Sequence, residues 1–186
     1  MEVKMKKVAV ILADGYEESE AVTLIDVLRR GGIKSVVVGY DGINVIGAHG
    51  IKIVADTDFS EFKVSDFDMI LLPGGFKNNE ILSKSEKFHK ILREFDDKKL
   101  KIGAICAAPW VLGSAGVLKN SYTCYPGFEK KINLAGFAGD KSNVVRDENV
   151  MTSRGPATAM EFALAIVKDL AGENVYNEVK AGLLFK

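Results

Sequence analysis

The sequence predicts an α/β fold, with a mainly parallel sheet and helices on both of its faces. Continuous apolar runs recur at residues 7–13, 67–72 and 101–105, as expected of strands that are buried on both faces. Stretches with helical periodicity lie between these runs. Glycine- and proline-containing turns separate the two kinds of segment, which is typical of alternating strands and helices packed in layers.

The predicted elements alternate along the chain. Strands are expected at residues 7–13, 35–39, 67–72, 101–105, 121–125, 144–146 and 149–153. Helices are expected at residues 17–30, 85–96, 109–113, 157–170 and 173–183. The stretch 41–56 alternates polar and apolar residues around a turn at 47–50, which predicts a small β-ribbon.

The composition is that of an ordinary globular protein and excludes several functional classes. The chain has 186 residues, with 25 Lys and Arg against 25 Asp and Glu, so its formal net charge is zero. Because basic residues are not in excess, the charge gives no indication of a nucleic-acid or membrane-surface partner. The charged start lacks a signal-peptide apolar region, and no run reaches membrane-spanning length. Two cysteines without C-x-x-C spacing predict neither a disulfide framework nor a metal site. We therefore expect a cytoplasmic protein.

Four unusual stretches follow predicted strands, at residues 14–20, 73–75, 106–107 and 153–156. Ligands in open α/β sheets bind at the carboxyl ends of the strands. The sequence therefore predicts that these stretches converge on one crevice.

Cys106 is the candidate nucleophile. It follows a buried strand, and Pro109 can open a helix directly after it. The resulting sharp turn resembles a serine nucleophile elbow, although Ala104 and Ala108 replace the glycines of that motif. The nearby helix N-terminus predicts a pKa for the Cys106 thiol well below about 8.5. The alternative is a buried structural cysteine.

The segment after the first strand carries acids where a nucleotide-binding fold would carry a phosphate cradle. Helical spacing places Glu17 and Glu20 towards the apolar face and Glu18 outwards. An inward carboxyl near Cys106 could hold a proton and act as a general acid–base. The alternative is that these acids only complement the helix dipole.

The remaining candidates are backbone groups and side chains near the crevice. The turn at residues 73–75 and the N–H of Ala107 could form an oxyanion hole, although an ordinary turn explains the same residues. Neither His49 nor His89 is an obvious base, because both are expected at the surface. Cys124 and Tyr125 lie closer to the crevice, although both could simply fill the core.

The motifs together resemble the ThiJ/PfpI superfamily, and within it the DJ-one branch of parkinsonism-associated, deglycase-like proteins. The motifs are ADGYEESE at 13–20, DVLRRG at 26–31, LPGG at 72–75, AICAAP at 104–109, TSRGP at 152–156 and EFAL at 161–164. The resemblance implies a flavodoxin-like three-layer sandwich. It also implies one domain over residues 1–186, related to class I glutamine amidotransferases, and usually a homodimer.

The resemblance also implies roles for individual residues. It assigns the oxidisable nucleophile to Cys106, its acidic partner to Glu20 and the backbone donors to Gly75 and Ala107. The family's peptidase-like members carry His after the cysteine, so Ala107 argues against peptidase activity. Further residues expected to line the site are Gly74, Tyr125, Arg154 and Pro156. Of these, Tyr125 takes the place of a histidine found in many relatives.

Two functions follow from this resemblance. The first is a cofactor-independent glyoxalase, or a deglycase, acting on methylglyoxal-type α-oxoaldehydes or their glycated adducts. The second is a non-enzymatic sensor of oxidative stress, or a redox-regulated chaperone, in which Cys106 becomes a sulfinate held by Glu20. A homodimer is expected through the helix at 17–30, because apolar residues cover most of its circumference.

Overall fold

The computed structural model describes residues 5–132 and 134–186 of the chain. The first four residues of the charged start lie outside these ranges. The strands are β1 (Lys7–Leu12), β2 (Lys34–Gly39), β3 (Asn44–Ile46), β4 (Lys52–Val54), β5 (Thr57–Asp58), β6 (Met69–Leu72), β7 (Lys101–Ile105), β8 (Val144–Asp147) and β9 (Val150–Ser153). The helices are α1 (Glu18–Arg30), α2 (Phe76–Ser83), α3 (Glu86–Asp97), α4 (Pro109–Ala115), α5 (Ala159–Ala171) and α6 (Glu173–Gly182).

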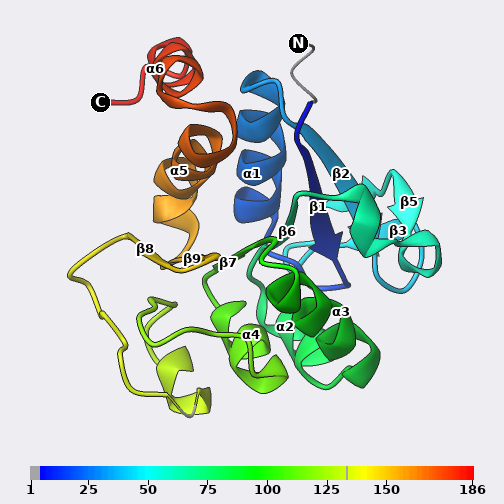
Figure 1. The fold of residues 1–186 in the computed structure, drawn as a ribbon. Helices are drawn as coiled ribbons and strands as arrows, with labels where there is room; N and C mark the ends of the chain where they lie inside the picture. The colour runs from blue at the N-terminus through cyan, green and yellow to red at the C-terminus, as the bar shows by residue number, and fades with distance from the viewer. Residues whose placement is uncertain (1–4, 133) are drawn as a thin grey trace.

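A seven-stranded sheet forms the centre of the molecule, in the order β5-β2-β1-β6-β7-β9-β8 (Figure 1). Every neighbouring pair is parallel except the last, because β8 and β9 form an antiparallel hairpin at one edge. Strands β3 and β4 form a separate antiparallel ribbon. The predicted mainly parallel sheet and the predicted small ribbon are both confirmed.

Helices cover both faces of the sheet, so the core has two parts. Helices α2, α3 and α4 pack on one face, and α1, α5 and α6 on the other (Figure 1). Side chains from β1 alternate between the two parts, with Ile11 in one and Val10 in the other. This two-sided burial explains why the strand is apolar throughout. In the described part of the chain, no helix is long and apolar enough to cross a membrane.

One predicted strand does not form, and the structure contains a helix that was not predicted. Residues 121–125 form no strand, and only an isolated bridge joins Tyr122 to Phe137. Helix α2 was not expected, because its buried positions include two asparagines, Asn78 and Asn79, instead of a regular apolar stripe. The extra helix has a functional consequence, since it begins directly after Gly75.

Candidate functional site

The carboxyl ends of β1, β6, β7 and β9 lie side by side, because these strands are consecutive neighbours in the sheet. Backbone hydrogen bonds connect the segments that follow them. The N–H of Glu17 donates to the carbonyl oxygen of Gly74 at 3.1 Å, and the N–H of Cys106 donates to the carbonyl oxygen of Ser153 at 3.0 Å. The structure therefore brings together the four stretches that the sequence placed at one crevice.

Cys106 lies at the sharp turn between β7 and α4. Its φ angle is +66°, in the left-handed region that non-glycine residues rarely adopt. Two distant segments hold this backbone, since its N–H is bonded to Ser153 and its carbonyl oxygen accepts from the N–H of Tyr125 at 2.9 Å. The predicted elbow is confirmed, and Cys106 is only partly buried. Such strained, well-supported positions are common at functional sites.

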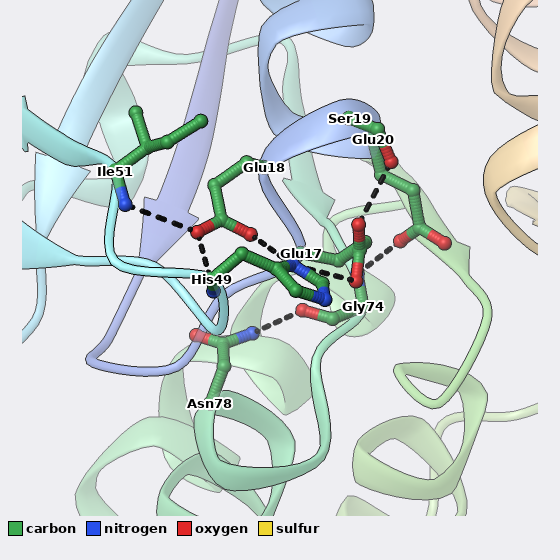
Figure 2. A network of polar contacts seen from close by, with 8 residues as sticks. All are labelled: Glu17, Glu18, Ser19, Glu20, His49, Ile51, Gly74 and Asn78. Atoms are coloured by element: carbon green, nitrogen blue, oxygen red, sulfur yellow. Dashed lines mark hydrogen bonds and ion pairs between the residues drawn. The ribbon is translucent and has the colours of Figure 1, made fainter.

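Glu20 projects from the first turn of α1 into the interior and is completely buried. Its Oε2 accepts a hydrogen bond of 2.6 Å from the N–H of Gly74 (Figure 2). Its Oε1 has no hydrogen-bond partner of ordinary geometry among the described residues. A Cβ at Gly74 would lie 2.5 Å from Glu20 Oε2 and 2.6 Å from Cys106 Cβ. Only glycine leaves room for the carboxyl and the cysteine to meet here.

Burial and mutual repulsion control the protonation of this pair. Burial raises the pKa of Glu20 to about 7, against the lowering effects of the Gly74 N–H and of Cys106. Burial also raises the pKa of the Cys106 thiol, and the charge and hydrogen bonding of Glu20 raise it further. The N–H groups of Ala107 and Gly75 act in the opposite direction. The expected low pKa of Cys106 is therefore wrong, because burial and a neighbouring acid outweigh the backbone donors.

The two groups consequently titrate as one coupled unit, because ionisation of either group opposes ionisation of the other. A thiolate forms readily only while Glu20 holds the proton, because ionising both groups would place two charges in a buried site. The expectation that Glu20 has a raised pKa is confirmed.

The backbone donors depend on a turn that only glycine can form. Gly75 has a φ angle of +97°, and a Cβ there would lie 2.1 Å from the carbonyl oxygen of Gly15. Asn78 Nδ2 donates to the carbonyl oxygens of Pro73 and Gly74, both at 3.2 Å. Asn79 Nδ2 donates to the carbonyl oxygen of Gly75 at 2.9 Å. The sequence analysis missed these two positioning residues, although an adjacent pair of asparagines just after two glycines was a visible signal.

Glu18 is buried, which corrects its predicted outward position. Its Oε1 accepts from the backbone N–H groups of His49 at 2.7 Å and Ile51 at 3.3 Å (Figure 2). Its Oε2 is 2.9 Å from His49 Nδ1. Burial raises the pKa of Glu18, but the combined effect of these hydrogen bonds is larger, so the pKa is lowered overall. The carboxylate thus fastens the β3–β4 ribbon to the start of α1.

Among the described residues, Glu18 and His49 join Glu17 in a group whose spacing could hold a metal ion. Ligand atoms of Glu17, Glu18 and His49 all lie within 4.8 Å of one another. Hydrogen bonds already satisfy both oxygens of Glu18, which explains the cluster without an ion.

Three predicted lining residues lie beside the nucleophile's segment. Tyr125, Arg154 and Pro156 border a hollow of about 250 Å³. Arg154 follows β9 directly, and the Nε of its guanidinium is buried without a partner among the described residues. The more voluminous hollow beside Lys7 and Lys34, of about 690 Å³, lies at the amino ends of β1 and β2, away from Cys106.

The second cysteine and the two histidines differ in how deeply they are buried. Cys124 is completely buried, and burial, followed by the charge of Glu129, raises its pKa to about 12. His49 is exposed as expected, with 70% of its side-chain surface open. His89 is buried, contrary to expectation, and its Nδ1 lies 3.6 Å from a carboxylate oxygen of Glu86.

Comparison with known proteins identifies this arrangement. The model of the DJ-1/PfpI family matches residues 6–169. The chain belongs to the DJ-1/PfpI family. It is 41% identical over 182 residues to the fruit fly (Drosophila melanogaster) protein dj-1beta, covering 96% of this chain and 97% of the relative. The crystal structure of Drosophila melanogaster DJ-1beta superposes with a TM-score of 0.93, covering 98% of this chain and 99% of that one.

A further DJ-1/PfpI relative carries a functional name. The nematode (Caenorhabditis elegans) protein "Glutathione-independent glyoxalase DJR-1.2" is 35% identical over 176 residues, covering 94% of each chain. Membership of the DJ-1/PfpI family and the flavodoxin-like architecture, both implied by the sequence motifs, are thereby confirmed.

Proposed function

We propose that this chain is a cysteine-dependent glyoxalase that needs no cofactor and converts α-oxoaldehydes such as methylglyoxal into α-hydroxy acids. The observation that carries the proposal is the buried Glu20 carboxyl, fixed at 2.6 Å by the Gly74 N–H beside the half-buried Cys106. A carboxyl with a pKa of about 7 can both accept and return a proton at neutral pH. The nematode relative named as a glyoxalase gives further support.

The proposed reaction begins when Cys106 Sγ bonds to the aldehyde carbon. The thiol proton ends on the aldehyde oxygen, and the product is a hemithioacetal. The N–H groups of Gly75 and Ala107 donate to that oxygen while it carries negative charge.

Glu20 then moves a proton between two carbons. Its carboxylate removes the proton from the former aldehyde carbon and returns one to the neighbouring keto carbon. The first carbon is oxidised to a thioester and the second is reduced to an alcohol, so the electrons balance within the substrate. Water then cleaves the thioester, which releases the α-hydroxy acid and restores the thiol. Glu20 Oε1, which has no hydrogen-bond partner of ordinary geometry among the described residues, is the oxygen that would carry this proton.

The test measures methylglyoxal consumption by purified protein without added glutathione. The wild type should turn it over, and Cys106→Ser and Glu20→Gln should each lose nearly all activity. Cys124→Ser serves as the matched control and should retain it. Equal activity in wild type and Cys106→Ser would refute the proposal. Parallel assays with a glycated peptide and with free aldehyde would distinguish a deglycase from a glyoxalase.

The second candidate is a redox sensor, or a chaperone regulated in the same way. The observation that favours it is that the half-buried Cys106 lies beside a carboxyl able to hold a proton near neutral pH. Such a carboxyl could donate a hydrogen bond to a sulfinate formed from the thiol. Selective peroxide oxidation of Cys106 without methylglyoxal turnover would favour this function. Both cysteines are free thiols, which fits the cytoplasm that we propose as the location.

We also propose a homodimer through α1 and the adjoining ribbon. Helix α5 packs against one side of α1. On its outward side Val22 remains 50% exposed, and in the ribbon Ile51 and Val54 are 57% and 69% exposed. A second copy of the chain would cover these exposed apolar side chains, of which Val22 and Val54 line one shared hollow. Val54→Lys should shift the protein to a monomer in light scattering, and a wild type that is monomeric at micromolar concentration would refute the dimer.

A further inference from the structure

A continuous cluster of aromatic side chains comes from the segments that flank Cys106 and its backbone donors. The rings of Phe76 and Trp110 have centroids 6.3 Å apart, and each lies 6.2 Å from the ring of Phe128. Tyr125 extends the cluster, with its ring 6.5 Å from Phe128 in an edge-to-face arrangement. We name these four residues the aromatic lip.

Each part of the aromatic lip is attached to the backbone that builds the site. Phe76 directly follows the donor Gly75 and begins α2. The N–H of Trp110 donates to the carbonyl oxygen of Ala107 at 3.2 Å. The N–H of Tyr125 donates to the carbonyl oxygen of Cys106 at 2.9 Å, and that of Phe128 to the carbonyl oxygen of Tyr125. The aromatic lip is therefore held in a fixed position relative to the thiol and its backbone donors.

The aromatic lip is open to solvent, although its residue types favour burial. Phe76 is 55% exposed and Tyr125 is 47% exposed, while Trp110 and Phe128 are half-buried. The ammonium of Lys131 lies 4.6 Å from the ring centroid of Trp110 and 5.9 Å from that of Phe76. Grouped exposed rings with a polar rim are typical of a binding surface.

We propose that the aromatic lip binds the substituent of the α-oxoaldehyde and selects aryl substituents over methyl. This inference rests on the proposed function. In that reaction the sulfur and the backbone donors hold the aldehyde end, so the rest of the substrate extends out of the site. A flat aryl group can stack against Phe76 or Trp110 and bury apolar area on both partners. A methyl group offers too little surface to use these contacts.

The kinetic test compares phenylglyoxal with methylglyoxal. Aromatic contacts of ordinary strength predict that Phe76→Leu lowers the phenylglyoxal-to-methylglyoxal ratio of kcat/KM by about threefold to tenfold. Phe185→Leu is the matched control. Like Phe76, Phe185 has a lysine ammonium over its ring, with Lys180 Nζ 6.0 Å from the ring centroid, but it belongs to the C-terminal segment and not to the aromatic lip. This control should leave the ratio unchanged. An unchanged ratio in both Phe76→Leu and Trp110→Leu would overturn the inference.

A binding test needs no turnover, because Trp110 is the only tryptophan in the sequence. Its fluorescence should change saturably with 2-hydroxyacetophenone, an unreactive aryl ketone, and much less with hydroxyacetone. Phe76→Leu should weaken the first response, whereas an absent response in the wild type would overturn the inference. A wild type that binds the aryl ketone but consumes no α-oxoaldehyde would refute the proposed function and leave the binding site standing.

Discussion

Replacing Glu20 with Gln should stabilise the protein, increasingly so as the pH rises. The carboxyl has a pKa of about 7 when folded, against an ordinary value of 4.5. The folded state therefore binds this proton more tightly than the unfolded chain does. The resulting stabilisation is complete below pH 4.5 and is lost as the pH rises through 7. Gln cannot ionise, so Glu20→Gln avoids this loss while its amide can still accept the Gly74 hydrogen bond.

The magnitude follows from the two pKa values. One pKa unit corresponds to about 1.4 kcal/mol. The free energy of unfolding of Glu20→Gln, relative to that of the wild type, should therefore increase by about 2.5 kcal/mol between pH 5 and pH 8. For a chain of this size, this corresponds to a relative increase in Tm of roughly 5–10 °C. The range stops below the ordinary thiol pKa of about 8.5, so ionisation of the unfolded cysteines contributes little.

Urea denaturation of both proteins at pH 5, 6, 7 and 8, at one protein concentration, measures this difference. Glu18→Gln is the matched control with the opposite sign, because hydrogen bonds lower the pKa of Glu18. Its ionised form contributes stability above pH 4.5, so this variant should be less stable than the wild type at neutral pH. A difference between Glu20→Gln and the wild type that stays constant from pH 5 to pH 8 would refute the pKa assigned to Glu20.

Three further predictions concern the same site. Glu20→Gln should speed alkylation of Cys106 by about tenfold at pH 8, because the wild-type carboxyl, with its pKa of about 7, is then mostly ionised and its negative charge opposes the thiolate; an unchanged rate measured with iodoacetamide would contradict this. Cys124→Ala should leave activity within a few-fold of the wild type, and a loss as large as that in Cys106→Ser would give it a catalytic role. Gly74→Ala should abolish turnover and lower Tm, because its Cβ would overlap Glu20 and Cys106; the control Gly182→Ala has nothing within 4 Å of its Cβ and should retain both.

The sheet and the place of the site could be predicted because both depend on patterns local to the chain. In β6 every residue is buried, and the sequence shows this as an uninterrupted apolar run. The convergence of segments around Cys106 followed from the rule that parallel strands end at the same edge of a sheet. Neither prediction required knowledge of a particular side-chain contact.

Three of the errors share a different cause, since each involves a polar side chain buried beside a group from a distant part of the chain. Glu18 was placed outwards because helical spacing cannot reveal the N–H groups of His49 and Ile51, which come from the ribbon. Asn78 is buried because its Oδ1 accepts from the N–H of Ala13 at 2.8 Å. The pKa of Cys106 depends on how deeply the thiol is buried and on its proximity to Glu20. Such contacts between distant segments are absent from any periodic pattern.

Because Glu18 attaches the β3–β4 ribbon to α1, hydrogen exchange in the ribbon should report on local unfolding there. The amide hydrogens of His49 and Ile51 are bonded to one carboxylate oxygen instead of to a neighbouring strand. Acidification that protonates Glu18 weakens both bonds at once, while the ladder bonds of the central sheet are unaffected. Their hydrogen exchange should therefore accelerate in acid ahead of the amides of β1, through an opening confined to the ribbon. Loss of this attachment would free the first turn of α1, and with it the helical turn that presents Glu20 to Cys106.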